Sequence, residues 1–226
     1  MQSNKEVAIG YKMSIRDNLI SVREHIPAGV TLVNVSKFHS SDAIMQAYEA
    51  GERDFGESRV QELVTKYETL PKDIRWHFIG HLQTNKVRQI VPFVHLIQSV
   101  DSLHLMQTIE AEAARINRII DVLLEVHVAK EQTKSGLTYD ELTQLLSCRH
   151  QMQHVHICGI MGMATLTDDE TEIRRCFNTI RQFSNLMDPL PIISMGMSDD
   201  YLLAIEEGSN MVRVGSAIFG TRNQSK

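Results

Sequence analysis

The sequence is poor in the residues that build disulfide scaffolds, flexible linkers and membrane spans. It has three scattered cysteines, Cys148, Cys158 and Cys176, with no C-x-x-C pair, which argues against a disulfide scaffold or a thiolate zinc site. Five prolines and twelve glycines form no linker, so we expect one domain over residues 1–226. No apolar signal core opens the chain and no run of 18 apolar residues occurs. We therefore expect a soluble, cytoplasmic protein that does not contact a membrane.

Excess charge of one sign is also missing. The formal net charge is −5, and acidic and basic residues are interspersed along the chain. Because no basic tract or arginine-rich arm occurs, we expect no nucleic-acid partner. With 226 residues and 42% hydrophobic residues, the chain is long enough to bury one large core.

What the chain does have is a regular alternation of short apolar runs and longer stretches of helical period. Residues 4–26 predict an opening amphipathic helix, within an N-terminal helical segment 1–27, because Val7, Tyr11, Ile15, Leu19 and Val22 recur at helical spacing. Apolar runs that predict strands lie near 31–35, 53–55, 75–79, 94–100, 121–128, 154–161, 190–195 and 211–214. Eight such units predict a single-domain (β/α)8 barrel with its core over 30–220. An open doubly wound sheet is the alternative, although no G-x-G-x-x-G follows any strand.

Polar residues follow the predicted strands at the ends where a barrel places its active site. They are Lys37 after the first strand, Glu57, Ser58 and Arg59 after the second, His81 and Asn85 after the third, Ser99 and Asp101 at the fourth, and His127 after the fifth. A lysine at the end of a core strand can carry a reactive amine, or it can mark where the strand surfaces. The pattern alone leaves both open, because every strand must end in something polar.

The last two strand ends combine glycine with serine. Gly196 and Ser198 precede a helix expected near Asp199, and Gly215 and Ser216 precede another short helical turn. Barrels often hold a phosphate at such helix starts after the seventh and eighth strands. The pattern predicts an anion site there, with an ordinary N-cap as the alternative for Ser198.

Two histidine patterns have metal-ligand residue types but do not predict a metal site. His154, His156 and Cys158 share one face of the sixth strand, but at its beginning, so we interpret Cys158 as a core residue and the histidines as packing or rim residues. His77 and His81 stand too far apart along an extended strand to share one ion. We assign no catalytic residue and no metal ligand.

Beyond these patterns, the sequence resembles the pyridoxal phosphate homeostasis protein family, barrels similar to the N-terminal domain of alanine racemase. The resemblance covers about residues 30–220 and rests on ordered blocks, which are VNVSK, DFGESRVQE, WHFIGHLQTNK, QSVDS, TKSGL, IMGMATLTDD, SMGMSDD and VRVGSAIFG. It implies pyridoxal 5'-phosphate (PLP), the vitamin B6 cofactor, held as an aldimine on Lys37. It implies phosphate contacts from Ser198, Gly215 and Ser216, with Arg213 near the pyridine ring and Met197 beside the cofactor. Ser58 and His127 stand where the family usually has asparagine, so a cofactor contact from Ser58 is an expectation at a divergent position.

The resemblance implies a carrier that holds PLP and releases or transfers it, rather than an enzyme with robust turnover. Racemases need a second base from a domain after the barrel, and this chain stops at Lys226 with no room for one. PLP-dependent apo-enzymes would be its partners, and a monomer is implied. Two alternatives remain at this point, which are a PLP-dependent racemase or lyase and a PLP-free phosphate-binding barrel enzyme.

Overall fold

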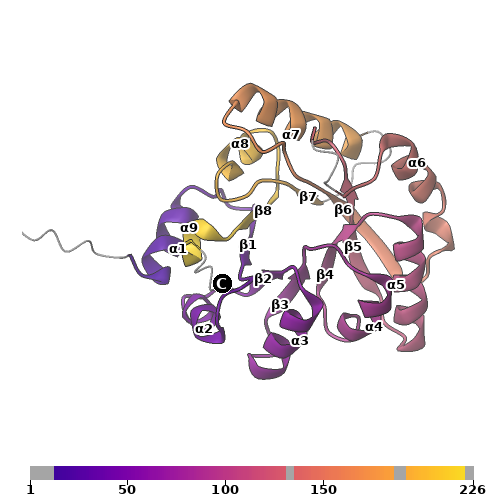
Figure 1. Cartoon of the computed structure of the whole chain (residues 1–226), viewed down its shortest axis with the longest axis horizontal. Helices are drawn as coiled ribbons and strands as arrows, with labels where there is room; N and C mark the ends of the chain where they lie inside the picture. Colours follow the sequence, from indigo (N-terminus) through magenta and orange to yellow (C-terminus); the bar gives the residue numbers. More distant parts are fainter. Residues whose placement is uncertain (1–12, 131–134, 186–191, 222–226) are drawn as a thin grey trace, which may run out of the picture.

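The computed structural model describes residues 13–130, 135–185 and 192–221, and Figure 1 shows them as strands surrounded by helices. All eight strands are parallel, each pairs with its neighbours in sequence, and β8 pairs with β1 to close a barrel. The strands are β1 (Thr31–Val35), β2 (Asp54–Glu57), β3 (Arg75–Phe78), β4 (Leu96–Val100), β5 (Ile120–Val126), β6 (Val155–Gly162), β7 (Ile192–Ser194) and β8 (Met211–Val214). The predicted (β/α)8 barrel is confirmed, and each predicted apolar run overlaps one strand.

Helices alternate with the strands and cover the outside of the barrel (Figure 1). The α-helices are α1 (Ile15–Glu24), α2 (Ser41–Glu49), α3 (Val60–Thr69), α4 (Val87–Ile90), α5 (Leu103–Arg115), α6 (Tyr139–Ser147), α7 (Glu170–Asn185), α8 (Tyr201–Glu206) and α9 (Ser216–Phe219). Two 3-10 turns, η1 (Thr84–Lys86) and η2 (Arg149–Gln151), complete the described elements. None of the helices in this part of the chain is long and apolar enough to cross a membrane.

The N-terminal helix begins later than the sequence predicts. Of the predicted span 4–26, residues 4–12 lie outside the described part, and α1 begins only at Ile15. Ser14 is extended and forms a capping box with Asp17, which satisfies the free N–H groups of the first turn and fixes the start there. The helix buries Leu19 and Val22, and the Asn18 side chain donates a hydrogen bond to the carbonyl of Ile218, at α9 (2.8 Å).

The side chains of each strand alternate between the helix layer and the barrel interior. In β1, Leu32 packs in the large cluster between barrel and helices, while Val33 belongs to a second, smaller cluster. The buried members of that second cluster come from β1, β4, β5, β6 and β8, and they are Val33, Leu96, Leu123, Cys158, Met161 and Met211. Cys158 therefore packs in the core as expected, and all three cysteines are free thiols.

Candidate cofactor-binding site

A cavity of about 240 Å³ opens at the carboxyl end of the barrel, and residues from both ends of the described chain line it. The lining residues are Val35, Lys37, His39, Ile79, Met163, Met197, Ser198, Asp199, Arg213, Gly215, Ser216 and Gly220. Six of them, Lys37, Met197, Ser198, Arg213, Gly215 and Ser216, are residues that the sequence singles out. The fold thus brings together in space residues that lie up to 179 positions apart, from 37 to 216.

Lys37 reaches this cavity because of the alternation along β1. Val33 faces the barrel interior and Val35 lines the cavity, so Lys37, two residues further on, continues the inward-facing row. The backbone turns sharply beyond it, since the N–H of His39 donates to the carbonyl of Ser36 (3.0 Å). Phe38 has a φ of 67°, a left-handed conformation that costs a residue with a side chain about 1–2 kcal/mol. Something must therefore hold this turn in place.

A buried ion cluster behind the barrel wall holds that turn. The Lys66 ammonium, on α3, donates to the Glu57 carboxylate (2.8 Å), to the Glu62 carboxylate (2.6 Å) and to the carbonyl of Ser36 (2.9 Å). Glu62 in turn accepts from the backbone N–H of Phe38 (2.6 Å), the residue with the left-handed backbone. Burial raises the pKa of Glu57 to about 7, although Lys66 and a hydrogen bond from Ser36 pull it down. The cluster fixes both backbone neighbours of Lys37.

At the opposite wall of the cavity, Ser198 ties together the loops after β7 and β8. Its hydroxyl oxygen accepts hydrogen bonds from the N–H of Gly215 (3.1 Å) and the N–H of Ala217 (3.4 Å), at the start of α9. The alternative considered for Ser198, an ordinary N-cap at the start of its own helix, is wrong. The helix α8 begins at Tyr201, with Asp200 at the N-cap position, because the Asp200 carboxylate accepts from the N–H of Met197 (2.6 Å) and closes a turn there.

Arg213 is a buried cation at the cavity wall, with 4% of its surface exposed. Its guanidinium donates to the Ser194 hydroxyl (2.6 Å) and to the carbonyl of Gly162 (3.1 Å). Burial lowers the pKa of Arg213 to about 10, while the nearby carboxyl groups of Glu125 and Asp200 oppose that shift. The side chain therefore keeps its positive charge at neutral pH, and its orientation is fixed by two hydrogen bonds.

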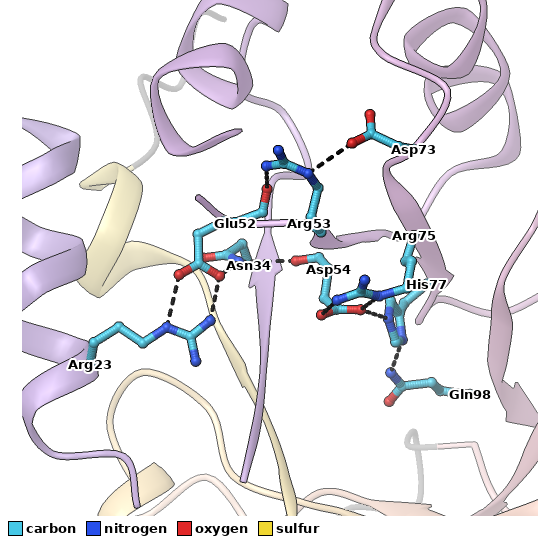
Figure 2. Close-up of polar contacts among 9 residues, drawn as sticks. All are labelled: Arg23, Asn34, Glu52, Arg53, Asp54, Asp73, Arg75, His77 and Gln98. Atoms are coloured by element: carbon cyan, nitrogen blue, oxygen red, sulfur yellow. Dashed lines mark hydrogen bonds and ion pairs between the residues drawn. The ribbon is translucent and has the colours of Figure 1, made fainter. Parts of the chain in front are cut away.

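From Arg213 a chain of buried hydrogen bonds runs down the barrel interior toward the opposite end. The Ser194 hydroxyl donates to Oε1 of Gln98 (2.7 Å), and Nε2 of Gln98 contacts Nδ1 of His77 (3.0 Å). The other ring nitrogen of His77 lies 3.1 Å from the Asp54 carboxylate, which also binds Arg75 (Figure 2). The barrel interior therefore contains a polar pathway between its two ends as well as an apolar core.

Several residues at the predicted strand ends do not line this cavity. Ser58 is not among the residues that line the cavity. Its backbone packs against Gly80, where an added Cβ would lie 2.3 Å from the Ser58 carbonyl oxygen. His81 pairs with Asp101 across neighbouring loops (3.1 Å), and its side chain is 66% exposed. His127 is also not among the residues that line this cavity. Its backbone N–H donates a hydrogen bond to the carbonyl of Leu137 (3.0 Å).

Sequence reasoning missed His39, Ile79, Met163 and Asp199, which also line the cavity, and the buried Lys66. The alternation along a strand could have found Ile79, because it stands two residues after the inward-facing His77. No sequence pattern of this kind points to Lys66. A lysine in an amphipathic helix is normally on the surface, and only the tertiary structure shows that its partners are buried carboxylates.

Comparison with known proteins agrees with this fold. The family model for the alanine racemase N-terminal domain matches residues 12–223. The pyridoxal phosphate homeostasis protein of Aquifex aeolicus is 38% identical over 197 residues, which are 84% of this chain and 86% of that protein. The protein of the same name in Escherichia coli is 34% identical over 233 residues, which cover 94% of this chain and 98% of that protein.

Solved structures show the same relationship. The structure of PipY from Synechococcus elongatus PCC7942 with PLP bound superimposes with a TM-score of 0.84 at 36% identity, over 92% of this chain and all of that one. An alanine racemase of Clostridium difficile has a TM-score of 0.78 at 11% identity and shares the fold, with this chain covering 58% of its length. The fold and the comparisons define a barrel of the alanine racemase N-terminal domain class. Within that class, the chain belongs to the family of pyridoxal phosphate homeostasis proteins.

Proposed function

We propose that this chain binds PLP at the carboxyl end of its barrel and serves in the homeostasis of PLP inside the cell. The observation that supports this most directly is the convergence of the Lys37 amine, the Arg213 guanidinium and the linked Ser198 and Gly215 groups on one cavity. Relatives at 34–38% identity are pyridoxal phosphate homeostasis proteins. PipY, at 36% identity, has PLP bound in its structure.

The residues present fit the parts of this cofactor. Lys37 would supply the amine that bonds covalently to the aldehyde carbon, with loss of one water, and an amine attacks only in its neutral form. Ser198, Ser216 and the amide of Gly215 would hold the phosphate, because hydroxyls and backbone amides are its usual donors. The Gly215 N–H, which donates to the Ser198 oxygen here, would exchange that acceptor for a phosphate oxygen. Met197 would pack beside the ring.

Arg213 is the reason that we propose a carrier rather than an enzyme. When bound, PLP supplies an electrophilic aldehyde and a ring that draws electrons best when its nitrogen is protonated. The Arg213 guanidinium, charged and fixed by Ser194 and Gly162, would disfavour a second positive charge beside it. The chain would therefore hold the cofactor without strong amino-acid chemistry and pass it to PLP-dependent apo-enzymes.

The phosphate assignment is tested by titrating the protein with PLP and with unphosphorylated pyridoxal. The double variant Ser198→Ala, Ser216→Ala should weaken PLP binding by about 10- to 100-fold for each lost hydrogen bond to a charged group, and should leave pyridoxal binding almost unchanged. Ser147→Ala, a surface serine on α6, is the matched control and should bind both ligands normally. Equal losses for PLP and pyridoxal would mean that these loops do not hold the phosphate.

The carrier role is tested with the PLP-loaded protein in two parallel assays. Mixed with the apo-form of a PLP-dependent enzyme, the loaded protein should restore its activity. Incubated with common amino acids, it should show no steady racemisation, transamination or decarboxylation. Sustained turnover on any amino acid would overturn the carrier assignment and favour a PLP-dependent enzyme.

A further inference from the structure

A second cluster of chemically versatile side chains lies at the opposite, amino-terminal end of the barrel. Asp54 on β2, His77 on β3 and His95 just before β4 each offer one ligand atom, and these atoms all lie within 4.8 Å of one another. They belong to three strands that are adjacent in the sheet, so the backbone hydrogen bonds of the barrel fix their relative positions. All three also line a separate cavity of about 240 Å³.

The spacing of these atoms suits one metal ion. Nε2 of His77 lies 3.1 Å from Oδ1 of Asp54. Two ligands that are each about 2.0–2.1 Å from one Zn²⁺ at a tetrahedral angle lie about 3.3 Å apart, so little movement is needed. The ring of His95 approaches the ring of His77 edge-on, with 5.5 Å between centroids. Within the described residues the imidazole of His95 makes no hydrogen bond, so a metal would not have to displace one.

Groups that could support these ligands are already in place. Gln98 contacts Nδ1 of His77 at 3.0 Å, and a metal-bound histidine needs a partner on its other ring nitrogen. Rotation of the Gln98 amide would present its oxygen to the N–H that Nδ1 carries when Nε2 binds a metal. The amide nitrogen would then donate to the Ser194 hydroxyl oxygen, in place of the bond that this hydroxyl now donates to Oε1 of Gln98. The backbone carbonyl of Asp54 is held by the side chain of Asn34 (3.0 Å; Figure 2).

Arg75 opposes a cation at this position. Its guanidinium binds both carboxylate oxygens of Asp54, although its own side chain is 48% exposed and can turn toward solvent (Figure 2). With a metal on Oδ1 of Asp54, Arg75 would keep only its contact with Oδ2 and act as an outer partner of the carboxylate. Removal of the Arg75 charge should therefore strengthen metal binding. If Arg75 and Asp54 formed only a structural ion pair, removal of that charge would not strengthen metal binding.

From this geometry we infer that Asp54, His77 and His95 form a Zn²⁺ site that joins β2, β3 and β4 at the amino-terminal end of the barrel. Two imidazoles and one carboxylate are ligands that suit this ion. The ligand atoms of a second group, Asp121, His156 and Cys158, also lie within 4.8 Å of one another, but this group is less suitable as a metal site. There both Asp121 and Cys158 contact the same ring nitrogen of His156, whose side chain is 66% exposed, whereas His77 is 1% exposed. The site lies at the opposite end of the barrel from the cofactor cavity, and its role is structural rather than catalytic.

The experiment is a titration of the untagged, PLP-free full chain with Zn²⁺, followed by calorimetry, and with Co²⁺, followed by visible absorption. We expect one bound ion and a melting temperature that rises with Zn²⁺. His95→Ala should weaken binding by at least about 100-fold, more than the effect typical of an outer-shell partner, and should abolish the rise in melting temperature. Arg75→Gln should strengthen binding about 10-fold. Both positions are exposed, and circular dichroism would verify that the variants fold.

His156→Ala is the matched control and should bind Zn²⁺ like the wild type. Loss of Zn²⁺ binding in His156→Ala, with binding retained in His95→Ala, would overturn the inference and place the ion at the cluster of Asp121, His156 and Cys158. A thiolate charge-transfer band with Co²⁺ would do the same, because only that cluster contains a cysteine. Failure of the wild-type chain to bind Zn²⁺, or weaker binding by Arg75→Gln, would also overturn it. These outcomes are distinguishable from a failure of the PLP assignment, because each is read from Zn²⁺ binding and the PLP cavity lies at the other end of the barrel.

Discussion

At the scale of single residues, the environment of Lys37 depends on a lysine that the sequence gives no reason to notice. Lys66 is 5% exposed, and its ammonium joins Glu57, Glu62 and the carbonyl of Ser36. A charge inside a protein is costly unless it is paired, and each member of this cluster neutralises another. The cluster is therefore both a stabilising element and the support for the turn that presents Lys37.

We predict that Lys66→Met destabilises the folded protein by about 3–5 kcal/mol, because it leaves Glu57 and Glu62 without a cationic partner. Urea unfolding measures this change. The matched control is Lys72→Met, an exposed lysine after α3 whose ammonium contacts the carbonyls of Tyr67 and Glu68 at the surface, and for which we expect a loss of only about 1 kcal/mol. Similar stabilities for the two variants would show that the buried cluster contributes little.

The pH dependence of stability gives a second test at this scale. Burial raises the pKa of Glu57 from its usual 4.5 to about 7. A carboxyl group with a higher pKa in the folded than in the unfolded state stabilises the fold fully below pH 4.5, and this contribution is lost as the pH rises through 7. The free energy of unfolding of the wild type should therefore fall relative to that of Glu57→Gln across this window. Parallel pH profiles of the two proteins would contradict the assignment.

At the scale of elements, the loops after β7 and β8 depend on close backbone packing. Gly196 has a φ of +95°, and an added Cβ would lie 2.6 Å from the Cβ of Ala204 and 2.9 Å from the Cα of Tyr201. The glycine therefore allows the loop to lie directly on α8. This packing places Ser198 where its hydroxyl can accept from the amides of Gly215 and Ala217.

Gly29 provides a matched comparison for Gly196, because it has the same φ of +95° but nothing within 4 Å of an added Cβ. Gly29→Ala should cost only the backbone term, about 1 kcal/mol. Gly196→Ala should cost more than twice as much, since it adds a steric clash, and should also weaken PLP binding. Thermal unfolding and a PLP titration of both variants measure these effects, and equal losses of stability would contradict the packing argument.

Contacts between elements are also where sequence reasoning failed. For Ser198 the local sequence left an ordinary N-cap open as the alternative to an anion site, but its hydroxyl oxygen accepts from amide groups 17 and 19 residues further along the chain. A local pattern cannot show this, because the distance between the two loops is set by closure of the barrel. The start of α1 was predicted too early for a different reason: the helical spacing of apolar residues continues upstream, while the capping box at Ser14 fixes the first residue of the helix.

At the scale of the whole molecule, the barrel itself could be predicted. Each strand is a short apolar run, and the eight runs alternate with helical stretches, so the order of elements determines the fold class. Because all the strands are parallel, their carboxyl ends meet at one end of the barrel, and this places Lys37, Arg213 and Ser216 there together. The polar chain from Arg213 through Ser194, Gln98 and His77 could not be predicted, because its members come from four strands and have no common sequence signature.

The central claim is that Lys37 is the residue that binds PLP covalently, and the most direct measurement is reduction of the PLP-loaded protein with borohydride, followed by peptide mapping. We predict a pyridoxyl adduct on Lys37, and loss of the visible absorbance of the loaded protein in Lys37→Ala. Lys66→Met should keep the adduct on Lys37, because Lys66 only supports the turn. An adduct confined to another lysine, such as Lys86, would contradict the account.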